Sequence, residues 1–250
     1  MVDNLNVVIL AAGKGKRMKN PEIPKVMVLL DGKPLLSYVV EQVKFLNPKR
    51  IIIIVGHKKE NVIEQFSYDK SLEFVEQKEQ LGTGHAVAQS ESLLANSVSL
   101  ILILCGDVPL LKSKTLSEFI DNHKSKKLDI SVLTTIADNP NGYGRIIRDS
   151  NGEFLKIVEQ KDATPDEQKV NEINSGVYIL SSQHLYNSLR EIGNSNAQQE
   201  YYLTDIVEIL HKQNCKVGAF PLASFEELQG INSPEDLQNV ENILMNLKNE

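Results

Sequence analysis

Continuous apolar runs alternate with amphipathic segments along the first part of the chain. The apolar runs are residues 7–10, 51–55 and 100–104, and a further short strand is predicted at residues 72–75. Between them, apolar residues recur every three or four positions, as on one face of a helix. The segments with this spacing are residues 35–46, 62–66 and 84–94. Because a strand covered on both faces is apolar throughout, the alternation predicts an α/β fold with a mainly parallel mixed sheet flanked by helices.

The pattern changes from Ile130 onward. Short strands are predicted at residues 130–135, 144–148, 154–159 and 177–180, separated by turn-forming residues. They predict a small antiparallel β insertion beside the parallel sheet. Helices are predicted at residues 183–192 and 205–211, with Thr204 as an N-cap, and Ser233 followed by Pro234 predicts a final helix. We expect one domain over residues 1–250, with parts at about 1–130, 131–232 and 233–250.

Composition and charge limit the kinds of function. The chain has 250 residues, 41% of them hydrophobic, which is enough to bury a large core. Its 27 basic and 33 acidic residues give a formal net charge of −6, which argues against a nucleic-acid-binding or membrane-surface protein. No apolar run approaches the ~18 residues of a membrane span, and no basic region precedes the first run. The two cysteines form no metal or disulfide pattern, so we expect a cytoplasmic protein.

The first apolar run leads into a basic, glycine-containing loop. A phosphate-binding loop of the NTPase type needs Gly-Lys-Ser/Thr, but Gly15 is followed by a Lys-Arg pair. A dinucleotide fingerprint needs a third glycine where Met18 stands. What remains is a glycine turn whose amides can face a base or phosphate, with three cations to neutralise a polyphosphate: Lys14, Arg17 and Lys25. A solvated basic loop is the alternative.

Asp107 lies just after the apolar run 100–104. A carboxylate there is costly unless it is paired, hydrogen-bonded or bound to metal. Mg2+ is commonly held by one or two protein oxygens together with phosphate oxygens, so Asp107 suits a metal that bridges to a nucleotide. The alternative is an aspartate that caps a turn before Pro109.

A second glycine-rich segment, residues 80–86, opens a predicted helix. Its glycines permit close approach of the backbone, and the free amides at a helix start can bind a polar ligand. Gln77 offers a donor and an acceptor, as reading a pyrimidine edge requires. His85 could act as a base, but a histidine packed at a helix start is the favoured interpretation, because phosphoryl transfer to an ionised nucleophile needs no base.

Amide, carboxylate and backbone groups gather in the predicted antiparallel part. They occur in residues 141–146, at Glu159 and Lys161, and in residues 172–176. Neutral and acidic hydrogen-bonding groups suit sugar hydroxyls better than phosphates. Turn chemistry for the glycines and a solvated face for Glu159 remain the alternatives.

Taken together, these motifs resemble the nucleotide-sugar pyrophosphorylase family. Residues 10–18 with Pro24 and Lys25 match its signature. Five further motifs, in the same order, are similar to the N-acetylglucosamine-1-phosphate uridyltransferase domain of the bacterial bifunctional enzyme that makes UDP-N-acetylglucosamine. They are residues 80–86, 142–146, 158–163, 172–176 and 200–205. The resemblance covers nearly the whole chain and implies a Rossmann-like nucleotidyltransferase fold.

The resemblance implies a Mg2+-dependent reaction of UTP with N-acetylglucosamine 1-phosphate, giving pyrophosphate and UDP-N-acetylglucosamine, a peptidoglycan precursor. It implies that residues 1–130 bind the nucleotide and residues 131–232 the sugar. The catalytic residues would be Arg17, Lys25 and Asp107, with Asp107 and Asn232 as metal ligands. The substrate-binding residues would be Leu10, Ala11, Ala12, Gly13, Gln77, Gly82, Thr83, Cys105, Gly106, Gly144, Glu159, Asn174 and Asn232.

Two departures from the family pattern leave alternatives open. Cys105 stands where a tyrosine is expected in Tyr-Gly-Asp, so a pyrophosphorylase for another sugar 1-phosphate or nucleotide remains possible, as does a non-catalytic nucleotide-sugar-binding module. The bifunctional enzyme also continues into a β-helix of hexapeptide repeats that carries acetyl transfer and trimerisation, and this chain has no such repeat. We expect no acetyltransferase activity. The oligomeric state stays open, as does whether the chain is a whole enzyme or part of one.

Overall fold

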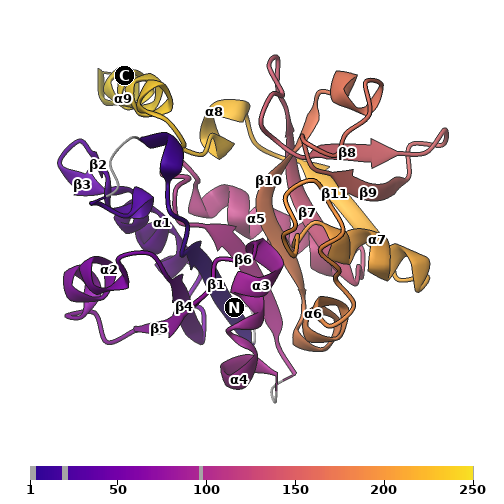
Figure 1. Cartoon of the computed structure of the whole chain (residues 1–250), viewed down its shortest axis with the longest axis horizontal. Helices are drawn as coiled ribbons and strands as arrows, with labels where there is room; N and C mark the ends of the chain where they lie inside the picture. The colour runs from indigo at the N-terminus through magenta and orange to yellow at the C-terminus, as the bar shows by residue number, and fades with distance from the viewer. Residues whose placement is uncertain (1–3, 19–21, 96–97, 250) are drawn as a thin grey trace.

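A nine-stranded mixed sheet runs through the molecule (Figure 1). The computed structural model describes residues 4–18, 22–95 and 98–249. The main strands are β1 (Leu5–Ala11), β4 (Arg50–Val55), β5 (Leu72–Glu76), β6 (Leu100–Cys105), β7 (Ile130–Ile136), β10 (Glu172–Ser181) and β11 (Val217–Pro221). They lie in the order β11-β7-β10-β6-β1-β4-β5. Two further strands, β8 (Arg145–Arg148) and β9 (Phe154–Val158), pair with each other, and β8 joins the sheet at β10.

The strand directions confirm the predicted fold class, a mainly parallel mixed sheet with a small antiparallel part. β1 is parallel to β4 and β6, β4 to β5, and β7 to β11. β10 runs antiparallel to both β6 and β7. The prediction was wrong in one respect, because residues 130–135 and 177–180 belong to the main sheet and not to an insertion. Of the four strands predicted for the insertion, β8 and β9 form an antiparallel pair beside the main sheet. The strand β11 was not predicted.

Helices cover both faces of the sheet. One face carries α1 (Leu35–Lys44), α2 (Lys59–Phe66) and α5 (Ser113–Ser125); the other carries α3 (Thr83–Ala88), α4 (Glu91–Leu94), α6 (Ser182–Leu189) and α7 (Asp205–Lys212). In β1, Val7 and Ile9 pack into the first apolar cluster and Val8 into the second, because side chains alternate along a strand. Each such buried side chain stabilises the fold by about 1.5–3 kcal/mol.

A third apolar cluster seats the last helix, α9 (Pro234–Asn249), over the short hairpin of β2 (Leu29–Leu30) and β3 (Lys33–Pro34). Its start is capped as predicted, because Ser233 Oγ accepts from the Asp236 amide at 3.2 Å and Asp236 Oδ2 accepts from the Ser233 amide at 2.9 Å. The same Asp236 oxygen accepts from the Asn232 amide at 2.9 Å. The cap therefore fixes the residue that precedes the helix.

The remaining elements are short: α8 (Phe225–Leu228) and the 3-10 turns η1 (Lys16–Met18), η2 (Lys25–Met27) and η3 (Glu167–Lys169). The helix predicted over residues 84–94 is divided into α3 and α4, and Ser90 lies at the break. Its hydroxyl donates to Val87 O at 2.6 Å and lies 2.9 Å from the Tyr186 hydroxyl. In the described part of the chain, every helix is too short or too polar to cross a membrane.

Candidate active site

The carboxyl ends of β1, β4 and β6 meet at one edge of the sheet, where ligands bind in parallel α/β sheets. The Gly106 amide donates to Leu10 O at 2.9 Å, and the His57 amide donates to Ala12 O at 3.3 Å. Gly56 is not among the predicted site residues, yet a Cβ there would lie 2.9 Å from Ala12 O. A glycine directly after a buried strand is the sequence signal that could have identified it. Ala11 and Ala12 are buried, and Gly13 is exposed beyond them.

Three predicted residues from distant parts of the chain converge at this edge. Lys25 Nζ forms an ion pair with Asp107 Oδ2 and donates to Asn232 Oδ1 at 3.0 Å. The Lys25 side chain is 18% exposed and that of Asp107 11%, so the pair is largely shielded from solvent. Such shielding strengthens the field that a lysine and a carboxylate exert on a nearby phosphate.

Backbone contacts hold the three residues in place. The Ile231 amide donates to the backbone oxygen of Asp107 at 3.0 Å, which brings the segment before α9 against the end of β6. Gly15 has a φ of +57°, and a Cβ there would lie 2.8 Å from Lys25 Cβ. The basic loop therefore packs on Lys25 and is not simply a solvated loop.

The chemistry of this cluster fits a divalent cation. Asp107 and Asn232 direct two oxygen atoms at one ammonium group, and Mg2+ prefers oxygen ligands completed by water and phosphate. Among the described residues, no group of three or more His, Cys, Asp or Glu side chains could hold a metal ion. Asp107 and Asn232 are the residues that would hold such a cation, each through one side-chain oxygen.

Arg17 and Tyr143 lie near the same cluster. Arg17 is exposed, and its charge acts on the Tyr143 phenol, whose pKa burial raises to about 12. The backbone of Gly230, two residues before Asn232, acts on the phenol in the opposite direction and lowers its pKa. Tyr143 was not a predicted site residue, although it lies within the Gly-Tyr-Gly-Arg motif. It connects the turn before β8 to the Lys25, Asp107 and Asn232 cluster.

Gln77 and His85 form a polar pair beside the ends of β4 and β5. Gln77 is 3% exposed; its amide nitrogen donates to Gly82 O at 3.0 Å and lies 3.1 Å from His85 Nδ1. Gln89 Nε2 lies 3.2 Å from the other ring nitrogen. The His85 ring is thus held between two amides, which agrees with a packing role. These contacts use the nitrogen of Gln77, so its oxygen can accept from a ligand.

The glycine-rich loop is fixed by residues more than a hundred positions later. Gly82 has a φ of +113°, and a Cβ there would lie 2.6 Å from Tyr201 O, so only glycine fits. The Gly84 amide donates to Tyr201 O at 2.8 Å, and Thr83 Oγ1 accepts from the Leu203 amide at 3.0 Å. The segment 201–203 thus holds the predicted uridine-binding loop.

Glu159 occupies a partly buried position just after β9. Its Oε1 accepts from the Thr204 hydroxyl at 3.2 Å. Burial raises the pKa of Glu159; the Thr204 hydrogen bond opposes this, and nearby Asp205 and Asp162 add to the rise. Thr204 does occupy the N-cap position of α7, but its hydroxyl makes no cap hydrogen bond and binds Glu159 instead. Glu159 is therefore a partly buried hydrogen-bonding group and not part of a fully solvated face.

Gly144 and Asn174 meet across the antiparallel part of the sheet. The Asn174 amide donates to Gly144 O at 2.9 Å, and a Cβ at Gly144 would lie 3.0 Å from Ile157 Cγ2. Fully buried Arg145 donates to Gln160 Oε1 at 2.7 Å and to the backbone oxygen of Tyr143. These bonds hold the turn before β8 against the segment that carries Glu159.

Cys105 ends β6 beside this sugar-side group. A Cβ at Gly176 would lie 3.0 Å from its Sγ, so the thiol faces a backbone without a side chain. Burial first, and the charge of Asp107 second, raise the pKa of the Cys105 thiol to about 12. The thiol is thus protonated at neutral pH and contributes shape, not charge.

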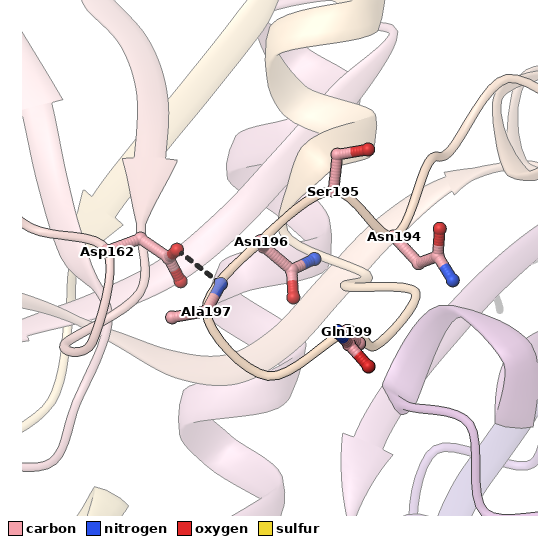
Figure 2. A pocket seen from close by; sticks show the side chains of 6 residues that line it. All are labelled: Asp162, Asn194, Ser195, Asn196, Ala197 and Gln199. Atoms are coloured by element: carbon pink, nitrogen blue, oxygen red, sulfur yellow. Dashed lines mark hydrogen bonds between the residues drawn. The ribbon is translucent and has the colours of Figure 1, made fainter.

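Two neighbouring cavities lie in the second half of the chain. The larger, of about 540 Å³, is lined by Asp162 and the segment 194–199 (Figure 2). Figure 2 shows Asp162 bonded to the Ala197 amide, at 2.9 Å. The smaller, of about 330 Å³, includes Glu159, Tyr202 and Asp205 in its lining. Neither lining includes Lys25, Asp107 or Asn232, and of the predicted sugar residues only Glu159 lines a cavity, the smaller one.

Residues 6–225 match the protein family described as nucleotidyl transferase. The chain is 46% identical over 237 residues to a protein of Streptococcus mutans named "Bifunctional protein GlmU", covering 95% of this chain and 51% of that protein. A protein of the same name from Caldanaerobacter subterraneus is 45% identical over 249 residues, covering 100% and 53%. These matches confirm the predicted resemblance. The chain spans about half the length of these curated relatives.

Solved structures with the same fold include a UDP-glucose pyrophosphorylase complexed with UDP-glucose. It has a TM-score of 0.76 at 20% identity, covering 98% of this chain and 99% of that one. The inositol-1-phosphate CTP transferase from T. maritima has a TM-score of 0.72 at 19% identity, covering 97% and 96%. At such identities the likeness shows the fold, and it confirms the predicted Rossmann-like nucleotidyltransferase architecture.

Proposed function

This chain belongs to the nucleotidyl transferase family, and we propose that it transfers the uridylyl group of UTP to N-acetylglucosamine 1-phosphate in a Mg2+-dependent reaction. The products are UDP-N-acetylglucosamine and pyrophosphate. The observation that carries the proposal is the convergence of Lys25, Asp107 and Asn232 at the carboxyl edge of the parallel strands. Such a shielded group of one cation and two oxygen donors suits the transfer of a charged phosphoryl group.

In the proposed reaction, an oxygen of the sugar phosphate forms a bond to the α-phosphorus of UTP, and the bond from that phosphorus to the pyrophosphate oxygen breaks. Lys25 stabilises the charge that develops on the transferred phosphoryl group, and exposed Arg17 binds the leaving pyrophosphate. Mg2+, held by Asp107 and Asn232, would neutralise phosphate charge when bound. No proton transfer is required, because the attacking oxygen is already ionised.

The nucleotide would lie over the ends of β1, β4 and β5. The backbone of Leu10 to Gly13 would face uridine, with Gly82 and Thr83 on the other side. Gln77 Oε1 can accept from the imide N–H of uracil, since its amide nitrogen is bound to Gly82. This pairing favours uracil over cytosine, whose equivalent ring nitrogen carries no hydrogen.

The sugar would lie between Gly144, Glu159 and Asn174. These residues present a carboxylate, a carboxamide and a backbone, which suit hydroxyl and acetamido groups. The choice of N-acetylglucosamine also rests on the motif resemblance to uridyltransferases. Cys105 favours a second candidate, a pyrophosphorylase for a different sugar 1-phosphate, since a small thiol stands against Gly176 where the family pattern has a tyrosine. A cytoplasmic role in making cell-envelope precursors is part of the same proposal.

The test is pyrophosphate release from UTP and N-acetylglucosamine 1-phosphate, with and without EDTA, beside the same assay with glucose 1-phosphate. We expect metal-dependent release that favours the acetylated sugar. Release only with another sugar or nucleotide would keep the reaction class and change the substrate. A protein that binds UDP-N-acetylglucosamine yet releases no pyrophosphate with any pair would be a non-catalytic binding module.

A further inference from the structure

The long strand β10 is interrupted beside the predicted sugar residues. Its register with β7 shifts between Asn174 and Val177, and Gly176 has a φ of +81°. Ser175 fixes this bulge from inside, because its hydroxyl donates to Leu133 O at 2.6 Å and accepts from the Val177 amide at 3.2 Å. A bulge re-aims the side chains next to it, here that of Asn174.

The Asn174 carboxamide is fixed at both of its polar atoms. Its Oδ1 accepts from the Gly176 amide at 3.0 Å, and its Nδ2 donates to the Tyr178 hydroxyl at 2.7 Å. An amide nitrogen can only donate, so the phenol oxygen is the acceptor of this bond. Among the described residues these two bonds use one N–H and one lone pair, and a carboxamide has two of each. One of each remains for a ligand.

The Tyr178 hydroxyl is not explained by packing. Tyr178 is 1% exposed and its ring belongs to the apolar cluster on the α6 and α7 face, where a phenylalanine ring would fill the same space. Burying a hydroxyl is costly unless it is hydrogen-bonded. Burial, with smaller contributions from Glu159 and Cys105, raises the pKa of Tyr178 well above its ordinary value, so the phenol keeps its proton. The hydroxyl therefore bonds to one predicted substrate-binding residue, Asn174, and the charges of two more, Glu159 and Cys105, act on its pKa.

We propose that Tyr178 is a positioning residue of the sugar pocket, whose hydroxyl orients the Asn174 carboxamide so that its free N–H and lone pair meet an acetylated amino-sugar 1-phosphate. The identity of the sugar rests on the proposed function. Tyr178 itself does not touch the reacting phosphate, so its loss should affect sugar binding and not the chemical step.

Tyr178→Phe, compared with Tyr186→Phe, tests the proposal. Tyr186 is a matched control because it is 3% exposed, lies in the same apolar cluster and bonds through its hydroxyl to Ser90, away from the sugar residues. The loss of one hydrogen bond corresponds to about a 3- to 10-fold weaker binding of the ligand. We expect Tyr178→Phe to raise KM for the sugar 1-phosphate by that factor, with kcat and KM for UTP within about twofold. Tyr186→Phe should leave all three parameters unchanged.

A double-mutant cycle with Asn174→Ala separates positioning from a general effect. If Tyr178 acts through Asn174, Tyr178→Phe has no further effect on KM for the sugar in the Asn174→Ala background. Equal changes in both tyrosine variants, or an undiminished effect without Asn174, would overturn the proposal.

The wild-type protein is assayed first, so that failure of the proposed function is seen separately. If it releases no pyrophosphate, calorimetric binding of UDP-N-acetylglucosamine to the same variants replaces KM, with Tyr178→Phe again expected to weaken binding and Tyr186→Phe to leave it unchanged. A wild-type protein that neither turns over nor binds the nucleotide sugar overturns both proposals.

Discussion

The two parts of the sheet hold their candidate site residues by different means. In the described residues up to 130, the polar groups stand at or near strand ends, where backbone bonds fix the chain that carries them, as where the Gln77 amide donates to Val55 O at 2.7 Å. In residues 131–232 they are fixed by side chains, as where Thr204 binds Glu159 and Tyr178 binds Asn174. A backbone bond survives most substitutions, whereas a side-chain bond can be removed by deleting one atom. We therefore expect the loss of a single side-chain partner to weaken the second part moderately. In the first part we expect large effects where a charged side chain of the site or a required glycine is itself replaced.

The largest effect is expected at Asp107, where the two parts meet. Asp107→Asn keeps the size of the side chain and removes the charge that pairs with Lys25 and would bind Mg2+. Loss of one preorganised group of this kind lowers kcat by about 100- to 1,000-fold. Pyrophosphate release at several Mg2+ concentrations measures the change, and more Mg2+ should not restore kcat.

The matched control for this change is Asp121→Asn, an exposed aspartate in α5. It removes the same charge away from the site and should leave kcat unchanged. Full activity of Asp107→Asn would remove the metal and charge roles assigned to this residue.

Much of the first part could be predicted from sequence, because its signals are local. Residues 51–55 are apolar at every position, as expected of a strand buried on both faces, and they lie within β4. Asp107 and Gly82 follow such runs within a few residues. The second part was less predictable. Residues 174–176 look like a turn in the sequence, yet they lie inside β10, since the bulge absorbs them.

Side-chain partners were the least predictable feature. The pattern predicts Thr204 as an N-cap, and the residue does precede α7, but nothing in the local sequence shows that its hydroxyl binds Glu159, 45 residues earlier. Asn232 was identified only by resemblance, because its place beside Lys25 depends on a contact over 207 residues. Such contacts follow from tertiary packing and not from periodicity.

The second largest effect concerns His123, at the junction of the two parts. His123, in α5, is 4% exposed, and its Nδ1 lies 2.9 Å from Ser131 Oγ in β7. Burial lowers its pKa to about 4, with Asp129 opposing and Lys124 adding to the shift. The unfolded chain binds this proton near the ordinary pKa of about 6.5. The neutral, buried His123 therefore contributes its full stability above pH 6.5. As the pH falls towards 4, the free energy of unfolding decreases by about 3 kcal/mol, because the unfolded chain takes up this proton first.

Urea unfolding between pH 7 and pH 4 measures this loss. His123→Gln keeps a group that can bond to Ser131 but cannot titrate, so its unfolding free energy should fall less over the same range. If the unfolding free energies of the wild type and of His123→Gln fall equally with pH, His123 is not the group responsible.

A third, smaller effect is expected at Gly82, whose loop belongs to the first part but is held by the second. Gly82→Ala places a Cβ at a φ of +113° and 2.6 Å from Tyr201 O. We expect a loss of about 2–3 kcal/mol in unfolding free energy, together with a higher KM for UTP. Gly152→Ala is the control, because Gly152 has a φ of +84° but open space around it. It should cost only about 1 kcal/mol and leave KM unchanged.

The smallest effect is expected at Thr204, whose hydroxyl is the side-chain partner of Glu159 in the second part of the sheet. Thr204→Val removes the hydrogen bond that lowers the pKa of Glu159, while burial continues to raise it. The Glu159 pKa therefore rises further, and the acidic limb of kcat/KM for the sugar 1-phosphate should move to higher pH. At pH values well above this acidic limb, loss of the hydrogen bond between Thr204 and Glu159 predicts about a 3- to 10-fold rise in KM for the sugar 1-phosphate.

Two further variants show whether this effect comes from Glu159 or from general loss of a buried hydroxyl. Thr204→Ser keeps the donor and should restore the pH profile. Thr135→Val removes a buried hydroxyl that donates to Ala223 O at 2.8 Å, so it should lower stability and leave the profile unchanged. If Thr204→Val leaves the acidic limb in place, the carboxylate of Glu159 does not contribute its charge to sugar binding, and its role reduces to shape and hydrogen bonding.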